Sequence, residues 1–429
     1  MSANIDENCF SKMSYNLTKI INKKEKQANG IYFTPPKTII RCYEILSELR
    51  AETFNNIMEP SCGSCEFIEK VKNYYPTATI TGVEYNKIIY ENIKNNYTNN
   101  DKIKIMEGDF LKTQYNNDKF DLIIGNPPYY VMKKTDVDKY YYNYFDGRPN
   151  IFILFIIKSL SLLTEDGILC FILPKSFLNC LYYNKTRKHI YDNYHILSII
   201  ECDDNYIDTE QPTIIFIIQK NSKKDNNEND KYILKHLAND YIIFSTYKVI
   251  KRLNELYINA TTLKALQYKV SVGNIVWNEN KSLLTNDPQK TRLIYSQDIK
   301  NNTLCNKCYT NATKKNYIDK KGFNEPLLVV NRGYGVGTYN FEYSTINCSI
   351  RQSLTHIKEY LIENHLICIK YAAGDADALA TGDADVLADK YIQIFRSFSD
   401  DRTKEFIKLY FGNSAINTTE LSNILPIYL

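Results

Sequence analysis

Short runs of hydrophobic residues alternate with helical segments along the first half of the chain. The runs end at Gly, Pro, Asn, Asp or Glu, which is typical of buried strands. The predicted strands are 55–59, 78–84, 103–107, 120–124, 168–173, 197–202 and 212–219. Residues 38–49 and 151–163 instead have the pattern of helices. Strands that alternate with helices predict an α/β fold with a doubly wound, mostly parallel sheet, which binds ligands at the carboxyl ends of its strands.

The pattern changes after this segment. Residues 221–230 are polar and predict a loop, and one more strand is expected at about 232–244. From about residue 250 the elements become short and irregular, and a helix is predicted at 390–410. We therefore expect a flexible tail over 1–22, a first domain over 23–250 and a second, α+β domain over 251–429.

Charge is unevenly distributed, although the net charge of the chain is only +4. Residues 236–371 carry 18 basic and 10 acidic side chains, whereas residues 372–429 carry five basic and nine acidic ones. An excess of positive charge favours a polyanionic partner. The middle of the second half of the chain is therefore the expected contact face for such a partner.

Composition narrows the class of protein further. The 429 residues are 44% hydrophobic, which allows a sizeable core and two or three domains. No apolar run is long enough to cross a membrane, and the N-terminus lacks the apolar core of a signal peptide. Eleven Cys residues form no disulfide-like framework, which fits a reducing compartment. We expect a cytoplasmic protein, in the host cytoplasm if the source is viral, with no membrane contact.

The most informative stretch follows the predicted strand at 120–124. It is Gly125-Asn126-Pro127-Pro128-Tyr129, in which the two prolines lack N–H donors and stiffen the loop. The loop presents the Asn126 amide, the Pro127 carbonyl and the ring of Tyr129. Two hydrogen-bond acceptors beside an aromatic face suit a flat group that carries an NH2.

This motif resembles the catalytic motif of amino-methyltransferases that use S-adenosylmethionine (SAM). The order of the motifs is similar to the gamma group, or Taq type, of DNA adenine-N6 methyltransferases. The resemblance runs from about Gly30 to the C-terminus and is tighter up to residue 220. It implies that SAM is the cofactor, that double-stranded DNA is the partner, and that residues 251–429 form a target-recognition domain.

Two further motifs suit a cofactor site. Glu59-Pro60-Ser61-Cys62-Gly63 predicts a turn of small residues before a helix, where a ligand can approach the backbone and free N–H groups. The family has an acid, a Pro and a Gly at the positions of Glu59, Pro60 and Gly63. Glu84 ends the second predicted strand at a spacing that suits hydrogen bonds to ribose hydroxyls.

The resemblance assigns the remaining cofactor residues. It implies that Thr34, in Tyr32-Phe33-Thr34-Pro35, touches SAM in the N-terminal motif of the family. It also implies that Asp109 accepts a hydrogen bond from the adenine amino group of SAM, while Phe110 packs on the adenine ring. Asn126 is expected to border the cofactor as well as the substrate.

The expected reaction is methyl transfer to N6 of an adenine that leaves the duplex. The flipped base would stack on Tyr129, and its amino group would donate to the Asn126 oxygen and the Pro127 carbonyl. Tyr206 is the candidate for a second stacking face. No metal is expected: Cys62 and Cys65 lie where small residues are needed, and Cys305 and Cys308 lack a second pair at zinc spacing.

Other functions share parts of this pattern. RNA adenine-N6 methyltransferases and protein glutamine-N5 methyltransferases are the alternatives, although the latter lack a C-terminal domain of this size. A non-enzymatic DNA-binding module would not need the cofactor motifs. We expect a monomer that is part of, or related to, a restriction–modification system, with any restriction endonuclease on a separate chain.

A near repeat stands out from the Asn-, Lys-, Ile- and Tyr-rich background. Residues 374–380 recur almost unchanged as 382–388, and both copies are rich in Ala and Asp. The Asp-x-Asp spacing resembles the start of a calcium loop, but the Gly and Glu that such a loop needs are out of register. We expect an acidic, solvated loop over 372–389.

Overall fold

The structure is a computed structural model, and it divides into two compact units. The described residues are 10–115, 119–204, 206–220, 226–236, 241–332, 340–348, 357–372, 384–411 and 415–429. The N-terminal unit comprises Met1–Ile250 and the C-terminal unit comprises Lys251–Leu429. Each unit is described by itself.

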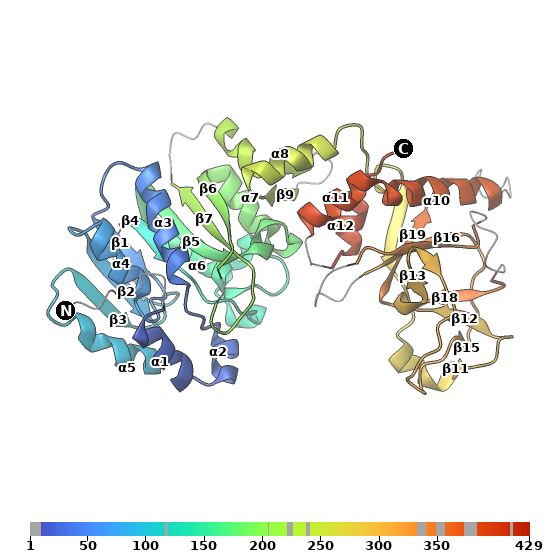
Figure 1. The fold of residues 1–429 in the computed structure, drawn as a ribbon, viewed down its shortest axis with the longest axis horizontal. Coiled ribbons are helices and arrows are strands. Elements are labelled where there is room, and N and C mark those ends of the chain that lie inside the picture. Colours follow the sequence, from blue (N-terminus) through green and yellow to red (C-terminus); the bar gives the residue numbers. More distant parts are fainter. Residues whose placement is uncertain are drawn as a thin grey trace. The chain divides into compact units, whose positions relative to one another are not determined.

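The N-terminal unit is built on a seven-stranded sheet in the order β3-β2-β1-β4-β5-β7-β6 (Figure 1). Its strands are β1 (Asn56–Glu59), β2 (Thr79–Glu84), β3 (Ile103–Glu107), β4 (Phe120–Gly125), β5 (Leu163–Pro174), β6 (His195–Cys202) and β7 (Thr213–Gln219). Only β7 runs antiparallel to its neighbours. The predicted doubly wound, mostly parallel α/β sheet is therefore confirmed.

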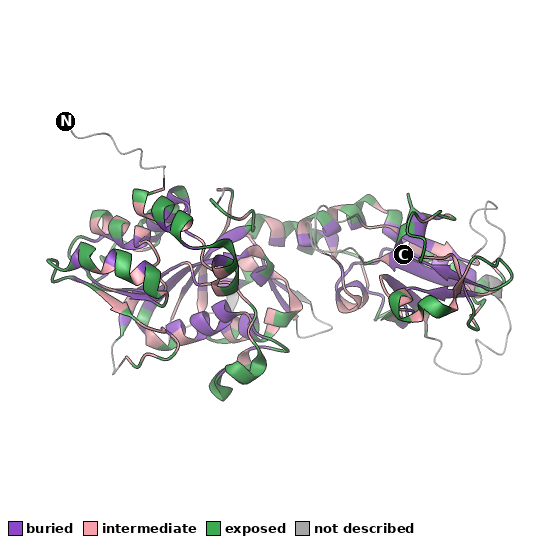
Figure 2. Ribbon diagram, turned by 90° about the horizontal axis from the view of Figure 1, so that it is seen from below, coloured by how far each residue is buried: buried purple, intermediate pink, exposed green. Residues whose placement is uncertain are grey.

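Both faces of this sheet are buried, because successive residues of a strand point to opposite faces. In β1, Ile57 belongs to one hydrophobic core and Met58 to the other. One face packs against α3 (Pro36–Leu49), α4 (Glu66–Tyr74) and α5 (Lys87–Ile93). The other packs against α6 (Ile151–Leu162) and α7 (Asn184–Asn193). Figure 2 shows the buried strands between these helices.

The N-terminal segment differs from the expected loose tail. From residue 12 it forms α1 (Lys12–Ile20) and α2 (Lys23–Asn29). Ser11 caps α1, and Leu17 is fully buried in the core under α3 and α4. The hydroxyl of Ser14 contacts Ser64 and the Glu66 carboxylate at the start of α4. These long-range contacts hold in place a polar helix that is too short to be stable by itself.

Other boundaries also differ from the prediction. The single strand expected at 232–244 is an antiparallel hairpin of β8 (Ile233–His236) and β9 (Tyr241–Phe244). The fifth strand starts at Leu163, earlier than predicted, and passes through Asp166 with a positive φ of 62°. Because β5 starts at Leu163, α6 ends at Leu162, one residue before the predicted end.

The C-terminal unit contains two four-stranded sheets (Figure 1). The first, in the order β10-β19-β16-β17, comprises β10 (Tyr268–Val272), β16 (Leu327–Asn331), β17 (Tyr343–Ile346) and β19 (Leu366–Tyr371). The second, in the order β11-β15-β12-β18, comprises β11 (Leu284–Thr285), β12 (Thr291–Ile294), β15 (Tyr317–Ile318) and β18 (Tyr360–Ile362). A small hairpin joins β13 (Ile299–Lys300) to β14 (Thr303–Leu304).

Helices complete the C-terminal unit. The helix α8 (Tyr247–Leu256) contains the boundary between the units. The helix predicted at 390–410 is two helices, α10 (Ala384–Ser399) and α11 (Asp401–Tyr410), because Asp400 caps the second one through the N–H of Arg402. A short helix, α12 (Thr418–Asn423), follows. Most of the Ala/Asp repeat, residues 373–383, lies outside the described residues.

Candidate functional site

A cavity of about 760 Å³ opens at the carboxyl ends of β1, β2 and β4, with the residues after β3 in its wall. We call it the first cavity. It brings together seven of the residues that the sequence motifs single out. These are Pro60, Ser61, Gly63, Glu84, Asp109, Phe110 and Asn126.

Glu84 is buried in the wall of the first cavity and is anchored by backbone donors. Its carboxylate accepts hydrogen bonds from the N–H of Gly63 at 2.8 Å and the N–H of Asn86 at 2.7 Å. Burial raises the pKa of Glu84 to about 7, since these two bonds only partly offset the loss of solvation. A carboxylate has about four acceptor positions, so it can still accept from the hydroxyls of a ligand.

Asp109 and Phe110 form the next part of the wall, and the side chain of Lys158 supports them from α6. The Lys158 Nζ donates to the carbonyls of Leu111 at 2.8 Å and Thr113 at 2.7 Å. It also lies 5.4 Å from the centroid of the Phe110 ring. Burial lowers the pKa of Lys158. Lys158 therefore holds the Asp109–Thr113 loop against the sheet, a contact that no motif in the sequence indicates.

Asn126 follows β4, and its amide is fixed in one orientation. The Nδ2 donates to the hydroxyl of Thr34 at 2.9 Å and to the carbonyl of Tyr32 at 3.4 Å. A carbonyl can only accept, so the Asn126 oxygen must point the other way. This oxygen accepts from the Tyr129 hydroxyl at 2.5 Å. The Ser61 hydroxyl donates to the backbone carbonyl of Asn126 at 3.1 Å, which connects this loop to the turn after β1.

Tyr129 and Pro127 are not among the residues that line the first cavity, whereas the sequence predicted that the Tyr129 ring would be a stacking face. Its single hydroxyl proton is shared between the Asn126 oxygen and the Ile172 carbonyl on β5, 2.7 Å away, and its ring packs edge-on against Phe152. Burial raises the pKa of the Tyr129 hydroxyl, so this group stays a donor. Tyr129 therefore orients the Asn126 amide, while Tyr130 lines the first cavity.

Thr34 and Glu59 do not line the first cavity either. Thr34 is buried and holds the Asn126 amide. Glu59 is buried behind the wall, where its Cγ would be 3.4 Å from a Cβ added at Gly125. Burial raises the pKa of Glu59 well above its ordinary value. Both residues support the loop that carries Asn126.

Gly30 ends α2 in the left-handed conformation, with φ of 63°. A Cβ at this position would lie 2.5 Å from the backbone nitrogen of Tyr129. Only glycine lets the N-terminal segment approach the loop after β4 this closely. Residues 29–33 thereby form one side of the first cavity.

A second cavity of about 1070 Å³ lies beside the first. It is lined by α2 and by described residues of the loop between β6 and β7, and it contains Tyr206. Tyr32 lines both cavities and accepts the hydrogen bond from Asn126. Lys26 and Asp208 pair at 2.7 Å across the second cavity and hold the loop to α2.

Several lining residues of the first cavity were missed from the sequence. They are Ile31, Tyr85, Asn86 and Tyr130. Tyr140 and Tyr141, which also line it, belong to the Tyr-rich segment 135–146 that the sequence predicted as a loop beside the site. Tyr85 and Tyr130 each directly follow a singled-out residue, which is the only local signal. Among the described residues, no group of three or more His, Cys, Asp or Glu side chains could hold a metal ion. Cys62 and Cys65 are both buried.

The strand order and the cavity define the class of protein: the N-terminal unit has the Rossmann-like fold of SAM-dependent methyltransferases. Residues 10–207 match a family described as Eco57I restriction-modification methylase. S-adenosylmethionine is therefore the cofactor. None of the helices in the described part of the chain is both long and apolar enough to span a membrane.

Individual relatives are similar over different parts of the chain. The type II methyltransferase M.CvrRI of Paramecium bursaria Chlorella virus XZ-6E is 27% identical, over 98% of this chain and 99% of its own length. The modification methylase CviBIII of Paramecium bursaria Chlorella virus NC1A is 32% identical, over 42% of this chain and 47% of its own. The solved DrdV–DNA complex shares the fold, with a TM-score of 0.53 and 14% identity, over 94% of this chain and 57% of that one.

Proposed function

We propose that this protein is a site-specific DNA methyltransferase that methylates N6 of adenine. The observation that carries the proposal is the Asn126 amide, whose oxygen is oriented by contacts on both sides of the residue. Asn126 lines the first cavity and is hydrogen-bonded to Tyr32, which lines both cavities. The amide therefore stands where a substrate nitrogen could meet the cofactor.

The residues of the first cavity fit SAM. Glu84 would accept from the ribose hydroxyls, Asp109 from the adenine amino group, and the Phe110 ring would cover the adenine. The positive φ of Gly63, 51°, keeps the backbone open to a ligand at the turn after β1. When bound, SAM supplies a methyl group on a sulfonium, an electrophile that needs no metal.

The loop after β4 would activate the substrate nitrogen. In free adenine the N6 lone pair is delocalised into the ring, so N6 is a poor nucleophile. The Asn126 oxygen has a second lone pair besides the one used by Tyr129. Together with the Pro127 carbonyl it would accept both amino hydrogens and localise the lone pair on N6, an effect of positioning and fixed dipoles. The methylated nitrogen would then lose its extra proton.

The second cavity is the proposed site of the flipped base. N6 is inaccessible to attack inside a stacked duplex, so the adenine must leave it. Tyr206 and Tyr32 line this cavity and offer aromatic faces, in place of the Tyr129 ring. This assignment transfers the stacking role from the catalytic motif to residues far from it in sequence.

DNA is the proposed substrate for two reasons. The relative that matches almost the whole chain is named a type II methyltransferase. The C-terminal unit also contains most of the segment with excess positive charge, which suits a polyanion. We further propose that the protein acts as a monomer within, or related to, a restriction–modification system, with a restriction endonuclease on a separate chain.

The direct test is methylation in a host that lacks DNA adenine methylation. The full chain is expressed with an unmethylated plasmid, and modified bases are mapped by single-molecule sequencing. We expect N6-methyladenine at every copy of one short sequence and none with Asn126→Ala. Methylation confined to RNA adenines or to protein glutamines, measured in the same cells, would contradict the proposal.

A further inference from the structure

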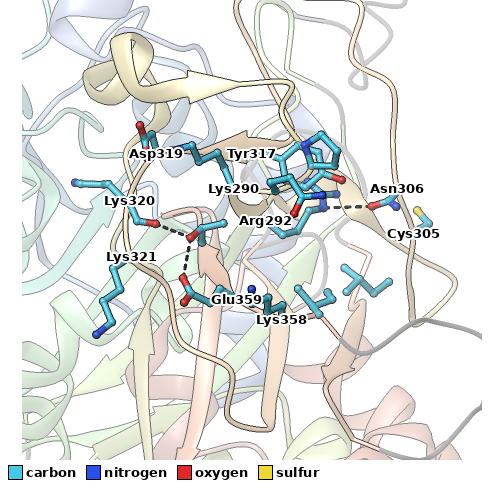
Figure 3. Close-up of a pocket in the computed structure, with 15 residues that line it drawn as sticks. Lys290, Arg292, Cys305, Asn306, Tyr317, Asp319, Lys320, Lys321, Lys358 and Glu359 are labelled. Atoms are coloured by element: carbon cyan, nitrogen blue, oxygen red, sulfur yellow. Dashed lines mark hydrogen bonds and ion pairs between the residues drawn. The ribbon is translucent and has the colours of Figure 1, made fainter.

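The C-terminal unit contains a cleft of about 570 Å³, and the consecutive lysines Lys320 and Lys321 are among the residues that line it. It lies along β12 and β15 and the residues just before β18. Figure 3 shows Lys320 and Lys321 on one side of this cleft and Cys305 and Asn306 on the other, with Glu359 and Lys358 below. We call it the basic cleft.

Part of the positive charge in the basic cleft is neutralised internally. Lys290 pairs with Asp319 at 2.8 Å. Arg292 is buried and pairs with Asp298 at 2.9 Å, while its other nitrogens donate to backbone carbonyls and to Asn306. These two cations hold the cleft together and are not free for a ligand.

Three exposed lysines provide the remaining charge. Within the described part of the chain, the Lys320 Nζ donates to one group, the neutral amide of Asn280, at 3.1 Å. Lys321 and Lys358 make no ion pair with any described residue at salt-bridge distance. Lys321 and Lys358 feel the longer-range attraction of Glu359. An ammonium group that is not held in an ion pair is suited to bind the oxygens of a phosphate.

One carboxylate borders these lysines and is held in place. Glu359 accepts from the backbone N–H of Gly322 at 3.1 Å and from the Thr291 hydroxyl at 3.2 Å. These bonds lower the pKa of Glu359, so it is ionised at neutral pH. A fixed negative charge repels phosphates from its own position and accepts hydrogen bonds from base amino groups. The cleft therefore holds one fixed negative charge close to Lys321 and Lys358.

We propose that the basic cleft binds DNA, with Lys320, Lys321 and Lys358 on backbone phosphates. The proposal rests on the proposed function and adds the surface that holds the substrate. The lysines project from loops anchored to β12, β15 and β18, so the positions of their backbones are set before DNA arrives. Lysine contacts to phosphates increase the affinity for DNA, but they do not discriminate between DNA sequences. Glu359 would limit where the phosphates can lie.

The test replaces all three lysines by glutamine in the full-length protein. Binding of a fluorescein-labelled, unmethylated DNA duplex is measured by anisotropy over a range of salt concentrations. Each phosphate contact contributes about 0.9 to the slope of log affinity against log salt, so we expect the slope to fall by up to about 2.7. Affinity near physiological salt should fall by about tenfold or more. The affinity for SAM should not change.

A matched control removes the same charge elsewhere on the C-terminal unit. Lys269, Arg396 and Lys408 are exposed and do not line the cleft. Their triple glutamine variant should retain most of the wild-type affinity and slope. If the control loses as much as the cleft variant, or if the cleft variant binds as the wild type does, the basic cleft is not the DNA surface.

Glu359→Gln gives an effect of the opposite sign. Glutamine keeps one carbonyl oxygen for Gly322 and Thr291 but removes the charge that repels phosphates. We expect this variant to bind duplexes of unrelated sequence severalfold more tightly than the wild type. Weaker binding would overturn the proposed role of Glu359.

Failure of the cleft and failure of the proposed function have different signatures. If the wild type methylates DNA while the cleft variant binds and methylates equally well, only the cleft assignment is wrong. If the wild type does not methylate DNA, the proposed function is wrong whatever the cleft does. If the same lysines bind an RNA duplex more tightly than a DNA duplex, RNA and not DNA is the partner of the cleft.

Discussion

The first cavity and the basic cleft use opposite charges in opposite environments. The first cavity is lined by carboxylates, and Glu84 is only 6% exposed. The basic cleft is lined by exposed lysines. A buried group interacts strongly and its pKa can shift, whereas exposed charges act through their number and are screened by salt. Ligand binding by the N-terminal unit should therefore be sensitive to single substitutions and to pH. Ligand binding by the C-terminal unit should instead be sensitive to salt and to multiple substitutions.

The largest expected effect is that of Asn126→Ala on turnover. Loss of one preorganised polar contact to the reacting group should lower the methylation rate by about 100- to 1,000-fold. SAM affinity, measured by calorimetry, should change little, because the amide is assigned to the substrate. Wild-type rates in this variant would exclude the proposed mechanism. A loss of SAM affinity of similar size would show that Asn126 contacts the cofactor.

Glu84→Ala should have the next largest effect, on SAM affinity. Charge-assisted hydrogen bonds to ribose hydroxyls are worth about 1.5–3 kcal/mol each, so affinity should fall by about 10- to 100-fold. Glu107→Ala is the matched control, because Glu107 lies opposite Glu84 at the end of β3, is exposed and does not line the cavity. Equal SAM affinities of the two variants would remove Glu84 from the site.

The pH dependence of SAM binding follows from the same residue. Because the pKa of Glu84 is about 7 in the folded protein, lowering the pH through 7 protonates the acceptor of the ribose hydroxyls. Affinity should fall by about fivefold between pH 7 and pH 6 if only the carboxylate binds, because Glu84 is already half protonated at pH 7. Glu84→Gln should bind more weakly and lose this dependence. A flat profile in the wild type would contradict the assignment.

The stability of the ligand-free protein should show the opposite trend. Glu84 is expected to ionise near pH 4.5 when unfolded and near pH 7 when folded. Its contribution to stability is therefore fully present below pH 4.5 and is lost as the pH rises through 7, by about 3 kcal/mol. Unfolding by urea at pH 5 and pH 8, in the wild type and Glu84→Gln, measures this difference.

The smallest expected effect is that of Lys158→Met. The variant keeps an apolar stem under Phe110 but loses the two hydrogen bonds to the carbonyls of Leu111 and Thr113. SAM affinity should fall by about three- to tenfold, since hydrogen bonds of this kind contribute about 1 kcal/mol each. Lys119→Met is the control, because Lys119 also donates to a backbone carbonyl, that of Ser161, but not to the loop that carries Asp109 and Phe110. Equal effects of both variants would show that the role of Lys158 is general stability.

Local signals in the sequence predicted much of the first cavity. Small residues after one strand, an acid at the end of the next and a Pro-Pro turn after a third all mark the carboxyl ends of parallel strands. Such ends meet at one edge of a sheet, so Gly63, Glu84 and Asn126 come together whatever the detailed packing. The alternation of strands and helices likewise suffices to predict the doubly wound sheet.

Contacts between residues far apart in the chain could not be predicted in this way. Thr34, which the resemblance assigns to the cofactor, accepts a hydrogen bond from Asn126, 92 residues away, and no local pattern predicted this bond. Tyr129 was expected to stack on the base but donates to Ile172, 43 residues away. Each side chain has a local preference that fits several environments, and only the packed sheet selects one of them.

Local pattern and composition were enough to predict the fold class, the cofactor motifs and the segment with excess positive charge. Three features came only from the folded structure: residues 12–20 form a packed helix, Gly30 lies against the loop after β4, and Lys320 donates to a neutral amide and not to a carboxylate. The physical reason is that short helices, close backbone contacts and ion pairing depend on partners distant in the chain, which a local pattern cannot specify.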